Sequence, residues 1–532
     1  MHPLILSYKD FNMAKKIKET KSKKVDKKVD KKVAQITTPK GKSKKPVSTP
    51  KKLEKEVDVK QVKFDKIRMW RLAQLDSIEK KEGLVSSLEI PYRLSTGLLS
   101  MDLALNGGFA SGWYSVSGME ASAKSTFVMQ LLSQAIKTSA EVLYFDAEGA
   151  VDSRYTTKIC GVNTLADVFG ERDNKGNWIK LPTSRYYDEN GLEIVFRTMK
   201  RFLLRLPEKR YRKDTGLWYY IFDKTKDSQS AMKEMGLKPD DKLLKKTGRY
   251  WCEADNGDFQ AVMILDSIPG LVTEDIGDDE DKGKQGVGLQ ARKFAEWVPQ
   301  VRGLIRKKHV LIHVVNQLRD KPMVLFGKPT YEPGGNALKF ASDVRNEMSS
   351  IATSTAPGNW GQGYNDDGTR TTQFTSEDSV EVDGTDKYAF KKLVNTKSKK
   401  GPPFKKGYAR VWIEDGKGDP RGFDIVYDTY IYLKETGQLN GSSNKFKLTI
   451  KGLEHITFTW ELFKALILGD TNKKVFKEYC KQLKLEKCPH LRKLCFSQIQ
   501  SGKAFELIRE LNISDDEDDD DEDDIDYDSE EI

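Results

Sequence analysis

Residues 118–126 read Gly-Met-Glu-Ala-Ser-Ala-Lys-Ser-Thr. This segment matches the phosphate-binding loop pattern G-x-x-x-x-G-K-[ST] at every fixed position but one, where Ala123 replaces the second glycine. It follows a short apolar strand pattern at residues 113–116 and precedes a helix-like apolar run. In such a loop, backbone N–H groups and the helix N-terminus bind phosphate. The segment therefore predicts a nucleoside triphosphate site in which Lys124 neutralises phosphate and Ser125 holds Mg²⁺. A chance match by a turn of small residues is the alternative on this segment alone.

Three further apolar runs have the length and composition of strands that are buried on both faces of a parallel sheet. They lie at residues 142–148, 261–267 and 309–317, and their last residues include Glu148, Asp266 and Gln317. Ligands of such sheets bind beyond the carboxyl ends of the strands. We therefore expect an α/β fold with a mostly parallel central sheet, at one edge of which these side chains converge with Lys124.

Four blocks of sequence carry a more specific resemblance. They are residues 95–105; residues 118–126 with 145–152 and Tyr155; residues 265–267 with 288–292; and residues 316–319 with 326–329 and 334–340. The last block is the most diagnostic, because other ATPases with this core lack a Gly-Gly-Asn-Ala-Leu-Lys-Phe stretch after the Asn-Gln strand. In these blocks the chain resembles the RecA-type DNA strand-exchange recombinases. The resemblance covers roughly residues 64–430 and implies a P-loop NTPase core of the RecA-like kind.

Composition and resemblance together predict five parts of the chain. They are a disordered Lys-rich tail at 1–62, an N-terminal oligomerisation helix and linker at 63–98, a RecA-like ATPase core at 99–430, a small α/β or helical C-terminal domain at 431–513, and a disordered acidic tail at 514–532. Within the core, an insertion at about 207–258 pairs two aromatic strands around a polar helical stretch. Its aromatic residues either pack a small β-hairpin, which we favour, or stack on bases.

The net charge of +10 is unevenly distributed. Residues 1–60 hold 19 lysines and 7 acidic residues, whereas residues 515–532 hold 14 acidic residues and no basic one. The remainder is basic, as expected of a protein that binds polyanions. The N-terminal tail either binds nucleic acid or solubilises the chain, and the acidic tail either competes with DNA for basic surfaces or solubilises the chain.

The five cysteines lack dense spacing, which indicates a reducing compartment. Cys488, His490 and Cys495 match no standard zinc pattern, so we interpret these cysteines as core residues. No apolar run reaches the roughly 18 residues of a membrane span. We expect a cytoplasmic protein without a membrane partner.

The resemblance implies ATP and Mg²⁺ as cofactors and assigns roles to particular residues. The nucleotide would contact Gly118, Met119, Glu120, Ala121, Ser122, Ala123, Lys124, Ser125, Thr126, Asp152, Tyr155, Lys397 and Lys399. Ser125 and Asp266 would hold Mg²⁺, Glu148 would orient the attacking water as the base, and Gln317 would sense the γ-phosphate. Lys397 and Lys399 would reach the ATP of a neighbouring subunit, and a solvated basic loop is the alternative for this pair.

DNA contacts are implied on two loops, because glycine amides and cations bind phosphate in any sequence and an apolar wedge separates stacked bases. The residues are Lys284 and Arg292 near the first loop, and Arg319, Lys321, Phe326, Lys328, Gly334, Gly335 and Asn336 near the second. The implied partners are single- and double-stranded DNA, further copies of the chain in a helical filament, and single-strand-binding and loader proteins.

Ala123 is the main departure from the family pattern, because glycine there keeps a side chain away from the phosphates. Related phage recombinases accept other residues at this position, so we expect activity with altered nucleotide affinity. This tolerance, the insertions and the divergent ends favour a phage-encoded member that acts in the bacterial host cytoplasm.

The expected function is ATP-dependent formation of filaments on single-stranded DNA, followed by homologous pairing and strand exchange in recombination and repair. One alternative is a hexameric helicase with the same core, which should carry an arginine finger in place of the Lys-x-Lys pair. The other is a non-catalytic DNA-binding filament protein, which should lack a Glu148–Lys124 pair.

Overall fold

The computed structural model describes residues 68–75, 90–273, 286–320, 330–351, 379–382, 386–414, 422–441, 445–450, 453–454, 457–468, 477–478, 480–481 and 490–518. The predicted tail at 1–62, most of the acidic tail and the greater part of both predicted DNA loops lie outside these residues. The chain divides into two units, residues 1–82 and 83–532. In the first unit, residues 68–75 form a helix, within the range 63–98 where an N-terminal oligomerisation helix and linker were predicted. Its large apolar side chains Met69, Trp70, Leu72 and Leu75 are exposed.

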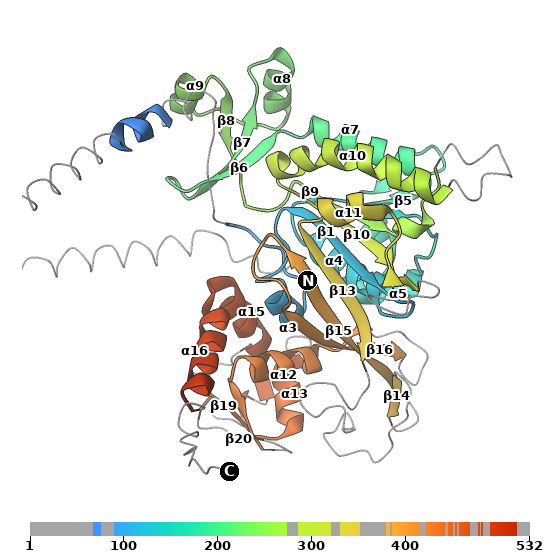
Figure 1. The fold of residues 1–532 in the computed structure, drawn as a ribbon, viewed down its shortest axis with the longest axis vertical. Coiled ribbons are helices and arrows are strands. Elements are labelled where there is room, and N and C mark those ends of the chain that lie inside the picture. The colour runs from blue at the N-terminus through green and yellow to red at the C-terminus, as the bar shows by residue number, and fades with distance from the viewer. Residues whose placement is uncertain are drawn as a thin grey trace, which may run out of the picture. The chain divides into compact units, whose positions relative to one another are not determined.

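A ten-stranded sheet forms the centre of the second unit, in the order β17-β16-β15-β13-β1-β10-β9-β2-β5, with β14 paired to β15 (Figure 1). The strands are β1 (Gly112–Gly118), β2 (Glu141–Asp146), β5 (Ser184–Asp188), β9 (Ala261–Asp266), β10 (Val310–Gln317), β13 (Val344–Ile351), β14 (Ser379–Val382), β15 (Asp386–Ser398), β16 (Lys406–Glu414) and β17 (Gly422–Phe423). All neighbours from β13 to β5 are parallel, whereas β14 to β17 add antiparallel pairs. The predicted α/β core with a mostly parallel sheet is confirmed.

Helices cover both faces of this sheet. Successive strand residues point to opposite sides, so each strand contributes apolar side chains to both layers of helices. On one face, Tyr114 and Val116 of β1 pack with Phe127 of α4 (Lys124–Ala135). On the other face, Trp113 packs with Phe294 of α10 (Gly286–Lys308). The remaining core helices are α3 (Leu99–Ala104), α5 (Ser153–Cys160), α6 (Ala166–Phe169), α7 (Leu192–Arg205), η1 (Ile268–Gly270) and α11 (Gly335–Ala341). Each large apolar side chain buried in these layers contributes about 1.5–3 kcal/mol.

Two antiparallel sheets interrupt the core. A hairpin joins β3 (Glu171–Arg172) and β4 (Trp178–Lys180). The larger insertion is a three-stranded sheet of β6 (Glu208–Arg212), β7 (Leu217–Phe222) and β8 (Tyr250–Glu253), with α8 (Lys226–Glu234) and α9 (Asp241–Thr247) between its last two strands. The predicted pairing of the two aromatic strands is confirmed, because Tyr220 lies opposite Cys252. Trp251 and Ile221 pack in the insertion's own small core.

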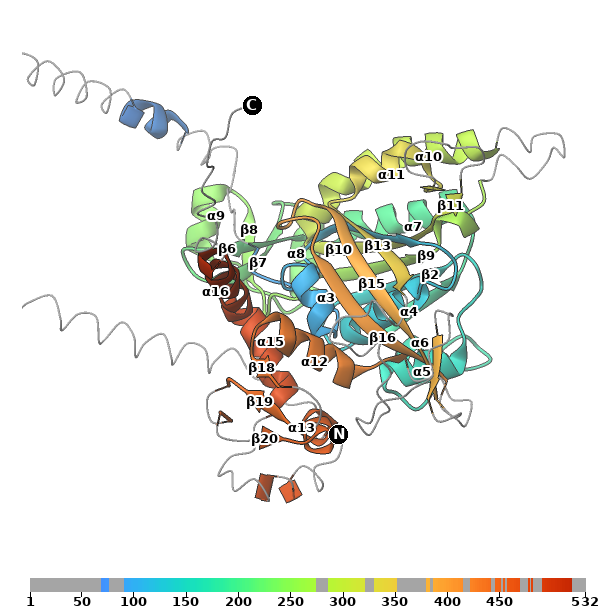
Figure 2. The same ribbon diagram turned by 60° about the horizontal axis from the view of Figure 1, so that its bottom comes forward.

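The C-terminal part is a mixture of short strands and helices next to α3 (Figures 1 and 2). Its elements are α12 (Ile425–Glu435), β18 (Leu439–Asn440), β19 (Phe446–Leu448), β20 (Thr457–Phe458), α13 (Trp460–Leu468), α15 (Leu491–Ser501) and α16 (Lys503–Asp518). Asp428 of α12 accepts hydrogen bonds from the backbone N–H groups of Leu99 (2.8 Å) and Ser100 (3.0 Å) and pairs with Arg492 (2.8 Å). This buried carboxylate ties the C-terminal part to the first turn of α3. The boundary predicted after residue 430 falls within α12.

None of the described helices is long and apolar enough to cross a membrane. Cys160, Cys252 and Cys495 are buried free thiols, whereas Cys480 is disulfide-bonded, which differs from the reduced thiols expected throughout the chain. The cluster of Cys488, His490 and Cys495 is not described as a whole, because Cys488 lies outside the described residues.

Candidate nucleotide-binding site and adjoining DNA-binding loops

The predicted phosphate-binding loop connects β1 to α4 at the carboxyl edge of the sheet. The Nζ atom of Lys124 donates to the carbonyl oxygen of Met119 at 2.6 Å and to Oγ of Ser122 at 3.2 Å. Burial lowers the pKa of Lys124, while the nearby carboxylates of Asp266 and Glu148 oppose this shift. The lysine is therefore held within the loop, at the position where the motif requires a cation for phosphate.

Left-handed backbone at Ala121 (φ 55°) and Ala123 (φ 67°) gives the loop its shape. This conformation costs an L-residue about 1–2 kcal/mol, which glycine avoids. Gly118 has a different constraint, because a Cβ atom there would lie 2.2 Å from the carbonyl oxygen of Met348. The Nζ atom of buried Lys391 donates to the carbonyl oxygen of Ala121 at 2.9 Å and so stabilises the loop. Lys391 was not predicted from the sequence, since it lies 270 residues away on β15.

The candidate Mg²⁺ ligands lie side by side. The hydroxyl of Ser125 hydrogen-bonds to Asp266 at the end of β9, and Tyr144 Oη donates to Oδ2 of Asp266 at 3.2 Å. Burial, together with the negative charge of Glu148, raises the pKa of Asp266 to about 6. A carboxylate and a hydroxyl are hard oxygen donors of the kind that Mg²⁺ prefers. A bound cation would offset the cost of the buried charge, so the donor set fits Mg²⁺.

Glu148 lies just beyond β2 and is contacted from two neighbouring strands. The hydroxyl of Ser267 donates to Oε1 of Glu148, and Nε2 of Gln317 lies 3.4 Å from the same atom. Sequence reasoning missed Asp146, whose carboxylate accepts from the backbone N–H groups of Glu148 (3.3 Å) and Val151 (3.0 Å). Asp146 therefore fixes the turn that presents Glu148, and its position at the end of an apolar strand was the available signal.

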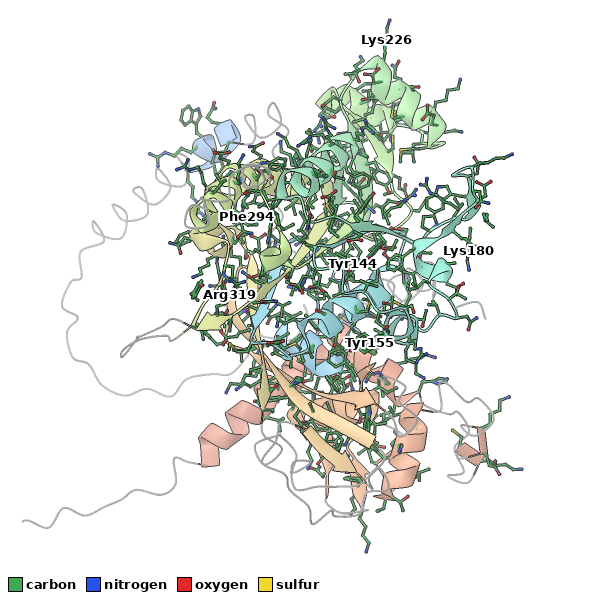
Figure 3. The ribbon with its side chains drawn as sticks, turned by 90° about the vertical axis from the view of Figure 1, so that its right-hand side faces the viewer. Tyr144, Tyr155, Lys180, Lys226, Phe294 and Arg319 are labelled. Carbon is green, nitrogen blue, oxygen red and sulfur yellow. The ribbon has the colours of Figure 1, made fainter. Side chains whose placement is uncertain are left out.

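Tyr155, which was predicted at the nucleobase, lies beside the first turn of α4 (Figure 3). Tyr155 Oη donates to Oγ1 of Thr126 at 2.5 Å, and burial raises the pKa of Tyr155 to about 12. Asp152 accepts from the backbone N–H of Tyr155 at 2.7 Å and so serves as the N-cap of α5. The carboxylate of Asp152 thus has a structural partner besides any nucleobase.

Lys397 and Lys399 lie at the opposite edge of the sheet from the phosphate-binding loop. Lys397 pairs in register with Arg345 near the start of β13, whereas the loop leaves β1 at its end, Gly118. The Nζ atom of Lys397 donates to the carbonyl oxygen of Lys339 at 2.7 Å, near the end of α11. The two lysines therefore do not meet Lys124 within one chain.

Five of the predicted DNA-binding residues are described, namely Arg292, Arg319, Gly334, Gly335 and Asn336, whereas Lys284, Lys321, Phe326 and Lys328 lie outside the described residues. The side chains of Arg292, Arg319 and Asn336 are exposed. Arg319 belongs to the hairpin of β11 (Arg319–Asp320) and β12 (Thr330–Tyr331). The two glycines have left-handed φ angles of 84° and 70°. A Cβ atom on Gly335 would lie 2.9 Å from Ala291, so glycine lets α11 approach α10 closely.

The segment after this hairpin is joined to the strands of the nucleotide site. Glu332 accepts from Ser117 Oγ at 2.8 Å and from Arg345 at 2.7 Å. Asn316 Nδ2 donates to the carbonyl oxygen of Pro333 at 3.0 Å. Sequence reasoning missed the partners of Glu332 because they lie on two different strands. These contacts place a physical connection between the carboxyl ends of β1 and β10 and the second predicted DNA loop.

Comparisons with known proteins agree with this geometry. The model of the RecA N-terminal domain matches residues 74–178 and 255–361, and the gap between the two matched parts contains the insertion of β6, β7 and β8. The chain is 27% identical to protein RecA of Aquifex pyrophilus over 284 residues, which cover 52% of this chain and 61% of that protein. It is 28% identical to protein RecA of Bdellovibrio bacteriovorus over 297 residues, with 56% and 58% covered. Protein RecA of Clostridium tetani is 26% identical over 293 residues, with 53% and 63% covered.

The similarity is confined to part of each relative. The chain spans about three-fifths of the length of the curated relatives it matches. A solved structure, the "Crystal structure of the RadB recombinase", has a TM-score of 0.31 at 16% identity, with 61% of this chain and 97% of that chain covered, which is too low to add to the argument. The predicted resemblance to RecA-type recombinases is confirmed, and the phage source stays a prediction.

Proposed function

We propose that this chain, whose core resembles that of the RecA-type recombinases, is a DNA-dependent ATPase that assembles on single-stranded DNA and catalyses homologous pairing and strand exchange. The observation that carries the proposal is the convergence of Lys124, Asp266, Glu148 and Gln317 at the carboxyl edge of the sheet. The same edge carries the hairpin with Arg319, which leads into the second predicted DNA loop. One site thus joins nucleotide chemistry to a DNA-binding segment.

In the proposed reaction, Mg²⁺-bound ATP would supply the γ-phosphoryl group. Lys124 and the N–H groups of the loop would bind the phosphates, and Ser125 and Asp266 would hold the metal. Glu148 orients the attacking water and accepts its proton on a carboxylate oxygen. Ser267 and Asp146 are positioning residues, because the first contacts the Glu148 carboxylate and the second fixes the Glu148 backbone. Tyr155 and Asp152 flank the nucleobase.

Coupling between nucleotide and DNA follows from the contacts of β10. Gln317 contacts Glu148, and its neighbour Asn316 contacts the segment that leads back from the second DNA loop. A change in the position of Gln317 when the γ-phosphate is lost therefore acts on the loop between β11 and β12. Arg292, Arg319 and Asn336 are exposed, and in this proposal they bind phosphates of the DNA backbone in any sequence.

Filament assembly follows from the opposite edge of the sheet. Lys397 and Lys399 complete the ATP site of the next subunit, as an arginine finger does in trans. The burial and neighbouring cations that lower the pKa of Lys397 make an incoming polyphosphate a favourable partner for this lysine. The exposed apolar side chains of the helix at 68–75 supply a second contact between subunits. Cytoplasmic location, accessory loading proteins and single-strand-binding proteins are part of the same proposal.

The decisive experiment is electron microscopy of the full chain on single-stranded DNA with a slowly hydrolysed ATP analogue, paired with a strand-exchange assay. Helical filaments and homologous pairing are expected. Rings that unwind forked DNA with 5′→3′ polarity would instead identify a hexameric helicase. Filaments without ATP turnover would identify a non-catalytic DNA-binding protein.

A further inference from the structure

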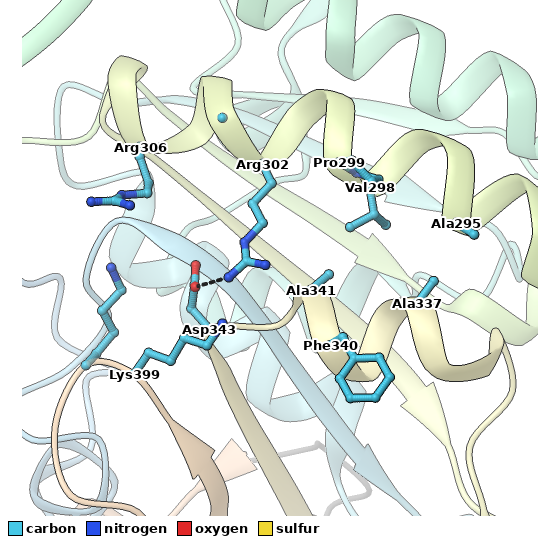
Figure 4. A pocket seen from close by; sticks show the side chains of 12 residues that line it. Ala295, Val298, Pro299, Arg302, Arg306, Ala337, Phe340, Ala341, Asp343 and Lys399 are labelled. Carbon is cyan, nitrogen blue, oxygen red and sulfur yellow. Dashed lines mark hydrogen bonds and ion pairs between the residues drawn. The ribbon is translucent and has the colours of Figure 1, made fainter.

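Two pockets adjoin each other at the C-terminal half of α10. A pocket of about 780 Å³ lies between α10, α11 and the turn after β15 (Figure 4). A second pocket of about 510 Å³ lies between the end of α10 and β6 of the insertion. Both are lined by Gly303, Arg306 and Lys400, so they adjoin each other. We refer to the combined lining as the α10 groove. Each part is within the size range of pockets that hold small ligands.

The α10 groove is strongly positive. Its cationic lining residues are Lys209, Arg210, Arg302, Arg306, Lys307, Lys399 and Lys400, whereas Asp343 is the one acidic residue that lines it in the described part of the chain. Asp343 lies 3.4 Å from Arg302, and Arg210 pairs with Glu208 at 2.7 Å. Arg306, Lys307, Lys399 and Lys400 make no ion pair with any described carboxylate. Such a concentration of like charge is unfavourable without a counterion.

Lys400, which lines both pockets, shows the effect of this positive charge on its pKa. Burial lowers the pKa of Lys400, Asp343 opposes the shift, and Arg306, Arg93 and Lys399 lower the pKa further. Two cations of α10 lie on the same side of the groove, since Arg302 and Arg306 are one helical turn apart (Figure 4). Several cations in series suit a chain of phosphates better than a single phosphate group.

The walls between the cations are largely aromatic or apolar. Tyr92, Tyr211, Trp218 and His309 line the part next to the insertion. Trp218 lies 4.2 Å from the His309 ring and 5.6 Å from the Tyr211 ring, centroid to centroid. At the other end, the Phe340 side chain is 73% exposed. Trp218 and His309 are buried, so their rings shape the wall of the groove, and the exposed cations supply the contacts that a strand backbone needs.

The α10 groove is separate from the loop that holds Lys124, but it shares Lys399 with the surface proposed to complete the ATP site of the next subunit. Ala110 and Ser111 in its lining precede β1, and His309 precedes β10, so the groove lies at the amino edge of the parallel strands. Lys124 and Arg319 lie at the carboxyl edge. Part of the lining comes from β6, within the residues that the RecA N-terminal domain model leaves unmatched.

We propose that the α10 groove binds the sugar–phosphate backbone of a single-stranded nucleic acid, with the insertion supplying one wall of the site. The choice of ligand rests on the proposed function as a DNA-acting protein, but the site itself does not require ATP. Arg306 and Lys307 at the end of α10 are its central phosphate contacts. Because the groove is preformed, part of the binding of a single strand is expected to need no nucleotide.

The test is equilibrium binding of a labelled oligodeoxythymidine to the full chain without nucleotide, over a range of salt concentrations. The double variant Arg306→Gln/Lys307→Gln should bind more weakly, and the slope of log K against log salt should shrink by about 1.4, since each single-strand phosphate contact contributes about 0.7. The control Lys245→Gln/Lys246→Gln removes the same charge from exposed residues of α9 that do not line the groove, and it should leave the slope unchanged.

Three results would overturn the proposal. The first is an unchanged slope in the groove variant, and the second is an equal loss in the control. For the third, residues 519–532 are removed from both the wild type and the groove variant. If the two shortened proteins then bind the oligonucleotide equally well, the groove binds the acidic tail and not the oligonucleotide. ATP turnover and strand exchange are measured separately. Absence of ATP turnover and strand exchange would contradict the proposed function but would not affect the nucleotide-free binding measurement. A negative result in the binding measurement would contradict the groove proposal but not the proposed function.

Discussion

The Nε2 atom of Gln317 lies 3.4 Å from Oε1 of Glu148, across the carboxyl ends of β10 and β2. The same carboxylate accepts a hydrogen bond from Ser267, which follows β9. Three adjacent strands of the sheet therefore meet at one carboxylate. This arrangement places the proposed base next to both the proposed γ-phosphate sensor and the metal-binding strand.

We expect Glu148→Gln to bind ATP and single-stranded DNA but to turn over ATP about 10²–10⁴-fold more slowly, because an amide cannot accept the proton of the attacking water. Filaments should consequently persist longer. Steady-state ATPase kinetics and filament lifetimes measure both effects. The control Glu141→Gln makes the same change at the other end of β2, where the side chain is exposed. A normal rate in Glu148→Gln would mean that another group orients the water.

Replacement of Lys124 by alanine tests the phosphate site itself. Turnover should fall by at least about 10²–10³-fold, the loss expected when one preorganised donor to a transition-state charge is removed. Nucleotide-stabilised DNA binding should be lost as well. Lys137→Ala is the control, since Lys137 lies just beyond the far end of α4. Wild-type turnover in Lys124→Ala would refute the assignment of residues 118–126.

The departure from the motif at Ala123 makes a prediction about stability. Because Ala123 has a φ angle of 67°, Ala123→Gly should raise the free energy of unfolding by about 1 kcal/mol. The opposite sign is expected for Ala135→Gly at the last residue of α4, because this change removes a buried methyl group and gives the unfolded chain more backbone freedom. Denaturant unfolding of the two variants distinguishes these signs. A destabilised Ala123→Gly protein would show that the alanine methyl group is needed for packing.

The sequence predicted the strands of the parallel sheet and the residues at their carboxyl ends because each apolar run is continuous and bounded by polar residues. It did not predict the partners of those residues. Lys391 supports the loop from β15, and Glu332 joins Ser117 to Arg345, and such contacts depend on strand order and register. No local pattern contains that information. For the same reason the antiparallel extension formed by β15, β16 and β17 was not predicted.

The buried histidine of β10 predicts a pH dependence of stability. His313 packs against Phe109, Phe127 and Tyr114, and neither of its ring nitrogens has a hydrogen-bond partner in the described part of the chain. Burial lowers the pKa of His313 to about 3. Between this value and the unfolded value of about 6.5, the unfolded chain binds a proton that the folded chain excludes. The contribution of His313 to the free energy of unfolding should therefore fall by about 1.4 kcal/mol per pH unit as the pH drops below about 6.5. Asp102 and Asp266, whose pKa values are raised to about 6 by burial, contribute with the opposite sign.

Denaturant unfolding at several pH values measures this slope. In His313→Leu, the free energy of unfolding should depend on pH less steeply, by the contribution of one proton, although the substitution also changes the packing of the core. His309 contributes a second proton, since burial lowers its pKa to about 3 as well. The control His490→Leu changes an exposed histidine and should leave the slope unchanged. An identical slope in His313→Leu and the wild type would contradict the prediction.

The acidic C-terminal tail provides the last prediction. Fourteen carboxylates lie within residues 515–532, and α16 is described as far as Asp518. A segment with this negative charge is attracted to basic surfaces. In this chain they include the proposed DNA-binding face and the Lys-rich N-terminal residues. The tail is thus predicted to compete with duplex DNA for those surfaces until single-stranded DNA displaces it. A tail that only increases solubility would have no such effect.

Deletion of residues 514–532 should therefore tighten duplex DNA binding at low salt and lower the Mg²⁺ concentration needed for pairing. The difference should vanish as salt rises, because screening at about 0.15 M limits exposed charges to about 8 Å. A full-length chain with the tail carboxylates changed to amides separates charge from length, and it should behave like the deletion. Duplex affinities that stay equal for the intact and shortened chains throughout a salt titration would rule out competition, because two polyanions that share a basic surface cannot bind it independently.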